Sequence, residues 1–192
     1  MANHFTKASF TFVVTPAEAD ILRLIDDAIE VLDDASLEPD GRAARFSELG
    51  PAFAACFPPA DADPFSGFLE IFSDPDYPRL GFTLQVDPPD TGDTVDVWIH
   101  GDQVDIEAAA ALIQATARSA LPFGFEYALD CDRMRPGEFG GGFVVNRPRK
   151  FDIDIDVVMI AKQVREYRVN RERFEIIQAE EMGADIGLPV RR

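Results

Sequence analysis

The sequence predicts an α+β protein whose antiparallel sheet has a ferredoxin-like, split βαβ order and carries two helices on one face. Two observations lead to this prediction. Apolar residues alternate with period two over several short stretches, which is typical of half-buried strands. Between these stretches, apolar residues recur three and four positions apart, which is typical of amphipathic helices. The resulting order is strand, helix, strand, strand, helix, strand, with one more strand behind it.

The first predicted strand and helix form a continuous unit. Apolar residues alternate over residues 8–14, and Thr15-Pro16-Ala17-Glu18 follows as a capping box with proline at the first helical position. We expect this helix to run to about Asp34 and to bury a stripe of Leu22, Ile25, Ile29 and Leu32. Its solvated side gathers six carboxylates, which form either an ordinary solvated face or a docking surface for basic residues: Asp20, Asp26, Asp27, Glu30, Asp33 and Asp34.

Residues 37–79 are predicted to be a packed insertion of short helices and turns over one end of the sheet. The stretch is rich in proline, but it also carries six phenylalanines that need burial: Phe46, Phe53, Phe57, Phe65, Phe68 and Phe72. A disordered linker would not carry so many aromatic residues. Helical spacing from Phe65 onward predicts a short helix that starts at about Pro64. These aromatics are best explained as core filling, with an aromatic ligand pocket as the alternative.

A hairpin is predicted behind the insertion. Residues 81–86 alternate as a strand, and so do residues 94–100. The seven residues between them are all Asp, Pro, Thr or Gly, a composition typical of turns. The two strands should therefore pair directly with one another.

A helix and a further strand complete the predicted split unit. Asp102 is the predicted N-cap of the helix, with Asp105 at its third position, where negative charge suits the helix N-terminus. A run of alanines gives this helix high propensity and a thin side wall, so that it can lie close to a sheet. Pro122 is expected to end it, and alternation resumes over residues 123–129.

Charge divides the chain near residue 147. Residues 1–146 hold 8 Lys and Arg against 26 Asp and Glu, whereas residues 147–192 hold 10 against 9. The sequence therefore predicts an acidic α+β domain over residues 1–146 and a strand-and-helix extension over residues 147–192. In the extension, residues 151–156 should form an edge strand with an acidic face or an extended lead-in to the next element. A helix is expected from about Val157, with basic residues that include Lys162, Arg165 and Arg168 as interaction candidates.

The net charge of −17 over 192 residues restricts the partners that this protein can have. It argues against direct binding to nucleic acid or to an anionic membrane surface. It favours docking on a basic protein surface, and it is also compatible with imitation of a nucleic-acid backbone. No apolar run approaches the roughly 20 residues that span a bilayer, so we expect no membrane segment. Two cysteines are too few for a disulfide framework, and reduced thiols in a cytoplasmic protein are expected.

Several residue groups could carry chemistry, and each also has a simpler explanation. Asp152, Asp154 and Asp156 could hold a hard cation such as Ca²⁺ or Mg²⁺, although Asp-x-Asp spacing recurs in this acid-rich chain. Cys131 and His100 could form a nucleophile pair, but no local motif supports it. The three glycines at residues 140–142 precede a strand and lack a lysine, which indicates a tight, flexible or bulged connection instead of a phosphate loop. We expect no cofactor.

Four stretches together resemble a group of small acidic, uncharacterised proteins of bacterial plasmids and prophages. They are Pro64-Phe65-Ser66-Gly67-Phe68, Gly101-Asp102-Gln103, Leu121-Pro122-Phe123-Gly124-Phe125-Glu126 and Arg135-Pro136-Gly137-Glu138-Phe139-Gly140-Gly141-Gly142. The resemblance covers residues 8–146, and the residues after Asn146 depart from the pattern. It implies a bacterial, cytoplasmic, mobile-element context and assigns no activity or functional residue.

These observations lead to three functional hypotheses. The first is a non-enzymatic interaction protein that docks on a basic surface of another protein. The second is a nucleic-acid mimic that inhibits a DNA-binding or defence protein. The third is a small hydrolase or transferase that uses Cys131 and His100 or a set of carboxylates. A concave pocket around those groups would favour the enzyme, whereas exposed acidic surface would favour the first two hypotheses.

Overall fold

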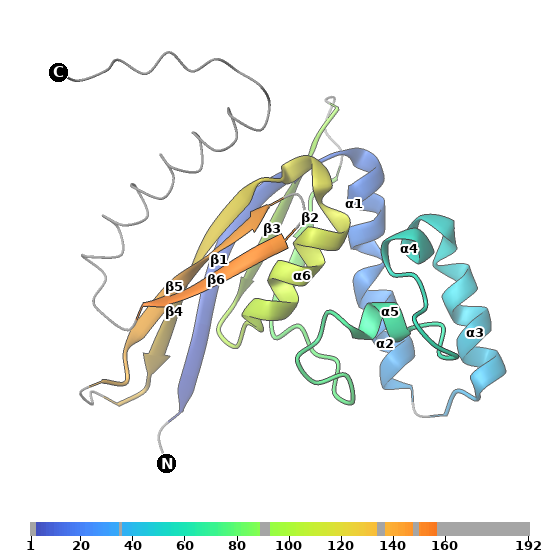
Figure 1. Cartoon of the computed structure of the whole chain (residues 1–192), viewed down its shortest axis with the longest axis horizontal. Coiled ribbons are helices and arrows are strands. Elements are labelled where there is room, and N and C mark those ends of the chain that lie inside the picture. The colour runs from blue at the N-terminus through green and yellow to red at the C-terminus, as the bar shows by residue number, and fades with distance from the viewer. Residues whose placement is uncertain (1–2, 35, 89–92, 134–136, 148–149, 157–192) are drawn as a thin grey trace.

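A computed structural model describes residues 3–34, 36–88, 93–133, 137–147 and 150–156, the last of these ranges as backbone only (Figure 1). Within these ranges, six strands form one antiparallel sheet in the order β2-β3-β1-β4-β5-β6. The strands are β1 (His4–Val14), β2 (Thr83–Val86), β3 (Val95–Gly101), β4 (Phe123–Cys131), β5 (Gly140–Arg147) and β6 (Lys150–Asp156). The predicted α+β class and antiparallel sheet are confirmed. The strand order differs from that of a simple split βαβ unit, because β5 and β6 extend the sheet beyond β4.

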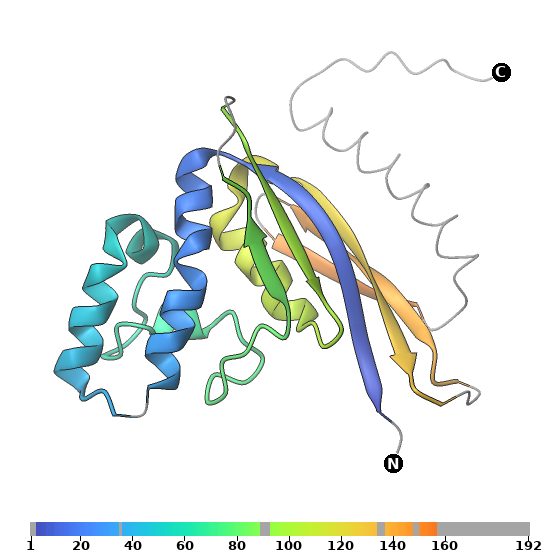
Figure 2. The same cartoon turned by 180° about the vertical axis from the view of Figure 1, so that it is seen from behind.

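Helices occupy one face of this sheet. They are α1 (Pro16–Arg23), α2 (Ile25–Asp33), α3 (Pro39–Glu48), α4 (Gly50–Cys56), α5 (Ser66–Leu69), α6 (Ile106–Thr116) and the 3₁₀ turn η1 (Arg118–Ala120). Helix α1 contacts β2, β3 and α6, and α6 contacts β5 and β6. Views from both sides show α6 and α1 against the sheet and α3 and α4 on the far side of α1 and α2 from the sheet (Figures 1 and 2). We call the side under α1 and α6 the covered face and the opposite side the open face.

The covered face is apolar because alternate residues of the strands point into it. Val95, Val97 and Ile99 of β3 are each at most 2% exposed, and α6 presents Leu112 and Ile113, both fully buried. Aromatic rings bridge β1 and β4 on this face, where Phe10 stacks on Phe125 with 4.1 Å between ring centroids. A polar side chain of β5 also belongs to this layer. The Asn146 amide of β5 is fully buried and donates to the Ala110 carbonyl of α6 at 2.7 Å.

The phenylalanines of the insertion form the core of the helical end. All six that were expected to need burial are at most 8% exposed: Phe46, Phe53, Phe57, Phe65, Phe68 and Phe72. Their rings touch in tilted and edge-to-face pairs, as at Phe57 and Phe68, whose centroids lie 5.0 Å apart. Core filling therefore accounts for these rings. The predicted short helix is present as α5, which begins two residues after Pro64.

The predicted helix over residues 16–34 is divided. Helix α1 ends at Arg23 and α2 begins at Ile25, with Leu24 between them at ψ −6°, so the axis breaks after two turns. The predicted capping box is confirmed. Thr15 Oγ1 accepts from the Glu18 N–H at 3.4 Å, and a Glu18 carboxylate oxygen accepts from the Thr15 N–H at 3.0 Å.

The hairpin and the helix behind it follow the prediction with one correction. Strands β2 and β3 pair directly and antiparallel. The N-cap of α6 is Asp105, whose Oδ1 accepts from the Ala108 N–H at 2.9 Å, so the prediction of Asp102 as N-cap was wrong. Residues 102–104 bond to the sheet and do not join the helix, since the Val104 N–H donates to the Thr6 carbonyl of β1 at 2.8 Å. The helix ends at Thr116, before η1, and not at Pro122.

The glycine run was expected to be a connection, and it lies inside β5. Residues 140–142 pair with Leu129, Ala128 and Tyr127 of β4. Local composition indicated a connection because glycine has low strand propensity, but pairing with β4, and for Gly141 and Gly142 also with β6, overrides this preference.

Strand β6 occupies the edge of the sheet, as predicted for residues 151–156. Its backbone places Asp152 opposite Val145, Asp154 opposite Phe143 and Asp156 opposite Gly141. The helix expected from Val157 lies outside the described residues, and so do its basic residues Lys162, Arg165 and Arg168.

Candidate functional sites

Three features of the described residues could carry function. They are the acidic side of α1 and α2, a pocket between β1 and β4, and a cluster of His4, Cys131 and Glu138. The metal prediction for residues 152–156 stays a prediction, because β6 is described as backbone only.

The acidic side of α1 and α2 is exposed throughout. All six residues predicted for this side are exposed to solvent: Asp20, Asp26, Asp27, Glu30, Asp33 and Asp34. Asp20 pairs with Arg23 at 2.8 Å. Asp34 accepts from the hydroxyl and the N–H of Ser36, and these hydrogen bonds lower the pKa of its carboxyl. Across the ranges that the structure describes, Asp26, Asp27, Glu30 and Asp33 form no salt bridge.

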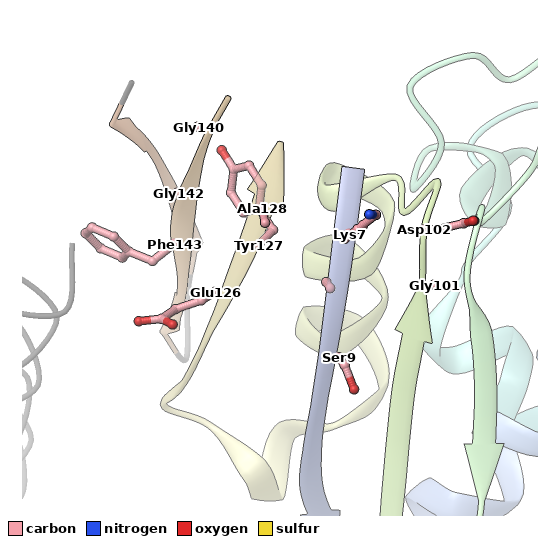
Figure 3. Close-up of a pocket in the computed structure, with 11 residues that line it drawn as sticks. Lys7, Ser9, Gly101, Asp102, Glu126, Tyr127, Ala128, Gly140, Gly142 and Phe143 are labelled. Atoms are coloured by element: carbon pink, nitrogen blue, oxygen red, sulfur yellow. The ribbon is translucent and has the colours of Figure 1, made fainter. Parts of the chain in front are cut away.

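A pocket of about 520 Å³ lies where β1 separates from β4 (Figure 3). The two strands pair from His4 and Cys131 to Lys7 and Ala128, and the ladder then ends. Lys7 and Ser9 line the pocket from β1, and Glu126 lines it from β4. Lys7 is already bound to Asp130, which offsets its positive charge.

The chemistry of this pocket is limited. None of its described lining residues is a histidine or a cysteine, and its glycines and alanines contribute mainly backbone. Glu126 is exposed, so its carboxylate remains hydrated. We find no arrangement of nucleophile and base among these lining residues.

The structure does not bring together the proposed pair of Cys131 and His100. His100 lies opposite Ser9 of β1, and Cys131 lies opposite His4 of the same strand. Five residues of extended chain separate these positions, which is roughly 17 Å along the strand. The His100 ring instead packs on Trp98, with 3.9 Å between ring centroids.

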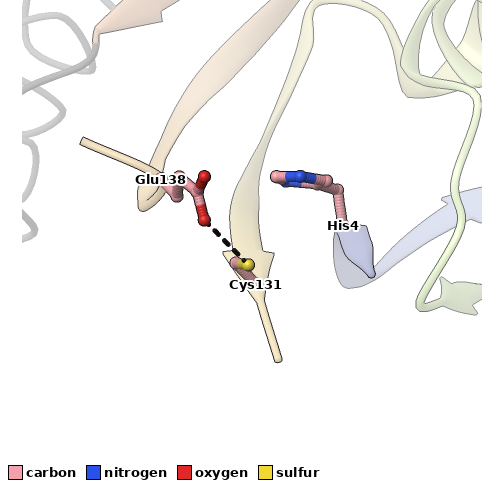
Figure 4. A group of neighbouring side chains, drawn as sticks. All are labelled: His4, Cys131 and Glu138. Carbon is pink, nitrogen blue, oxygen red and sulfur yellow. Dashed lines mark hydrogen bonds between the residues drawn. The ribbon is translucent and has the colours of Figure 1, made fainter. Parts of the chain in front are cut away.

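Cys131 has a different histidine near it. The ligand atoms of His4, Cys131 and Glu138 all lie within 4.8 Å of one another at the end of the sheet (Figure 4). The Cys131 thiol donates to Glu138 Oε2 at 3.1 Å. Cys131 is 7% exposed, His4 is exposed and Glu138 is half-buried.

The protonation of Cys131 reflects its acidic surroundings. A backbone hydrogen bond from Arg133 acts to lower the pKa of the thiol. Burial and the Glu138 and Asp132 carboxylates act in the other direction, and the pKa is raised above its ordinary value. The thiol is therefore protonated at neutral pH and is a poor nucleophile in this state.

The sequence could not indicate this cluster. His4 and Cys131 lie in no common motif, and they meet because β1 and β4 pair in one register. Glu138 then reaches Cys131 from the connection that precedes β5. A correct prediction of the pairing between the first strand and the strand that ends at Cys131 was the only signal that could have revealed the group.

Comparisons with known proteins identify no relative: no family model, curated protein or solved structure matches the chain. Among the helices of the described ranges, none has both the length and the apolar character needed to cross a membrane.

Proposed function

We propose that this is a non-enzymatic interaction protein that docks on a basic surface of a partner protein through the exposed side of α1 and α2. One observation carries the proposal. Asp26, Asp27, Glu30 and Asp33 are exposed on consecutive turns of α2, and no salt bridge within the described residues neutralises them.

Helical geometry places these four carboxylates next to one another on one side of α2. Residues three and four positions apart are neighbours on a helix, so Asp26 and Asp27 both adjoin Glu30, and Glu30 adjoins Asp33. Like charges at this spacing repel each other in the free protein. A basic partner relieves that repulsion and is steered toward the face by its field.

The rest of the molecule supports a role in binding more than it supports a role in catalysis. In the pocket between β1 and β4, Ser9 accepts a hydrogen bond from Trp98 and Lys7 is bound to Asp130, so these two lining residues are not arranged as a nucleophile and its base. The Cys131 thiol is held protonated by a raised pKa. Mimicry of nucleic acid is a narrower form of the same proposal, since it requires a DNA-binding partner for the same face.

We also infer that the fold behind this face is an extended ferredoxin-like one. The support is the order of the first four strands, in which β1 lies between β3 and β4 and β2 lies outside β3. A split βαβ unit arranges its strands in this way. Strands β5 and β6 would then be additions beyond β4.

The proposal is tested with two variants that each neutralise four carboxylates, one set on the acidic side of α2 and the other set elsewhere on the surface. The face variant is Asp26→Asn, Asp27→Asn, Glu30→Gln and Asp33→Asn. The matched control neutralises four exposed carboxylates elsewhere, Glu38→Gln, Asp40→Asn, Glu70→Gln and Asp76→Asn. Each immobilised full-length protein is exposed to bacterial lysate at low salt, and the retained proteins are quantified as salt is raised.

We expect the wild-type chain and the control to retain the same discrete partner and to release it as salt increases, because screening weakens exposed charge pairs. The face variant should lose that partner. Equal retention by both variants, or the absence of a salt-released partner, would contradict the proposal. Release by duplex DNA would identify the partner as a DNA-binding protein and support the mimic.

A further inference from the structure

We propose that His4, Cys131 and Glu138 form a zinc-binding site at the end of the sheet. One imidazole nitrogen, the Cys131 Sγ and one Glu138 carboxylate oxygen would be the three protein ligands. This site is separate from the acidic side of α1 and α2, and it does not depend on the docking proposal.

The spacing of the three donor atoms is close to that of a metal site. Zinc binds sulfur at about 2.3 Å, and nitrogen and oxygen at about 2.0–2.2 Å, so tetrahedral ligand atoms lie about 3.4–3.6 Å from one another. Here all three atoms lie within 4.8 Å, and the Cys131 Sγ is 3.1 Å from Glu138 Oε2. Small changes of side-chain rotamer, chiefly in exposed His4, would bring them onto one ion.

The backbone under the site is well supported. His4 and Cys131 are directly opposed across β1 and β4, a relation that places Cβ atoms about 4.5–5.5 Å apart. Asn3 and Asp132 fix the strand ends, since the Asn3 N–H and amide donate to the Asp132 carboxylate at 3.0 and 2.9 Å. Gln103 also donates to the His4 carbonyl at 3.1 Å. Ligands on such supported strands reach the ion with little loss of conformational entropy.

The donor set selects the kind of ion. A thiolate, an imidazole and a carboxylate together suit zinc, whereas calcium and magnesium take oxygen ligands. Three protein ligands leave the fourth tetrahedral position to water. Asp132 is the next carboxylate, with Oδ1 4.0 Å from the Cys131 Sγ, but both of its oxygens accept from Asn3.

Zinc binding would replace the thiol proton of Cys131 with the metal ion. The thiol proton, which now lies toward Glu138, leaves to solvent as the sulfur–zinc bond forms, so that Zn²⁺ and the thiol give a zinc thiolate and one H⁺. The ion would also offset the repulsion between the thiolate and the Glu138 and Asp132 carboxylates. Zinc would thereby connect β1, β4 and the segment that precedes β5.

The test is a zinc titration of the full-length chain after metal removal, in competition with a chromophoric chelator. We expect one tight site per chain, and a thiolate-to-metal charge-transfer band when cobalt(II) replaces zinc. His4→Ala should weaken zinc binding by at least about tenfold, because it removes a direct ligand. Cys131→Ser should abolish the cobalt band.

Matched controls use the other histidine and the other cysteine. His100→Ala and Cys56→Ala should leave both zinc affinity and the cobalt band unchanged, since neither residue belongs to the cluster. His4 is exposed, so its variant should fold even if Cys131→Ser does not. Failure of the wild-type chain to bind one zinc, or equal affinity of His4→Ala and the wild type, would overturn the proposal.

Discussion

The two faces of the sheet differ in how far their side chains are exposed to solvent. On the covered face, Val97 and Ile99 are fully buried beneath the helices. On the open face, Trp98 of the same strand is 39% exposed, and Val13 of the neighbouring strand β1 is 45% exposed. Alternate residues of the same strands form the two faces, but the helices pack on only one of them.

This difference separates stability from surface chemistry. Substitutions on the covered side remove packing and leave cavities, whereas substitutions on the open face exchange one partly hydrated group for another. We therefore expect the free energy of unfolding to depend strongly on the covered side and weakly on the open face. Three substitutions test this contrast, two in the helical layer on the covered side and one on the open face, from the largest expected effect to the smallest.

Phe68→Ala should have the largest effect. Phe68 is fully buried, and its ring lies within 5.4 Å of the centroids of Phe53, Phe57 and Phe72. Its removal should lower the free energy of unfolding by about 3–5 kcal/mol. Urea denaturation followed by circular dichroism measures the change. Tyr77→Ala, at a 72% exposed position, is the control. A loss below about 1 kcal/mol at Phe68 would mean that the insertion does not pack as a core.

Glu18→Gln should have an intermediate effect, because Glu18 joins two parts of the helical layer. Its carboxylate accepts from the Thr15 N–H at 3.0 Å and from the N–H of Ser119, in η1, at 2.8 Å. Burial acts to raise the pKa of Glu18, but the hydrogen bonds from Ser119 and Thr15 outweigh it and lower the pKa. The substitution should cost about 1 kcal/mol at neutral pH.

The sign of the pH dependence follows from the lowered pKa. The ionised Glu18 contributes its stability in full above the pKa of an unfolded glutamate, and this contribution is lost as pH falls through the folded-state pKa. The wild-type chain should therefore exceed Glu18→Gln in stability near neutral pH and converge with it in acid. A difference that stays constant or grows on acidification would contradict this account. Asp40→Asn, at an exposed position on α3, provides the comparison.

Val13→Ser on the open face should have the smallest effect, within about 0.5 kcal/mol. The chain has a single tryptophan, Trp98, so its fluorescence reports on this face during the same measurements. Its indole N–H donates to Ser9 Oγ at 3.1 Å, and its ring should be accessible to acrylamide. A cost above about 1 kcal/mol, or a protected tryptophan, would show that another segment or molecule covers the open face.

Local signals explain what the sequence could predict. The capping box at Thr15 acts over four residues, and the alternation of Val95, Val97 and Ile99 depends on β3 alone. Both features are confirmed. The phenylalanines of the insertion were also predicted correctly as buried, because burial follows from side-chain chemistry without knowledge of the partners.

Long-range pairing explains what the sequence could not predict. Strand β1 begins at His4, four residues before the predicted start, because polar residues there are held by pairing with β4. The glycines of β5 are strand residues for the same reason. The cluster of His4, Cys131 and Glu138 depends on that register as well. Each of these features is determined by contacts across more than ten residues of sequence, which local patterns do not record.

The central place of β1 has a consequence for how the chain folds as it is synthesised. Its two neighbours, β3 and β4, follow it by roughly eighty and more than one hundred residues. At about 5–20 residues per second, on the order of ten seconds pass between the completion of β1 and that of β4. Until β3 is complete, β1 has no partner on either edge, and its β4 edge stays unpaired for the whole interval. The sheet can therefore assemble fully only when most of the chain has left the ribosome.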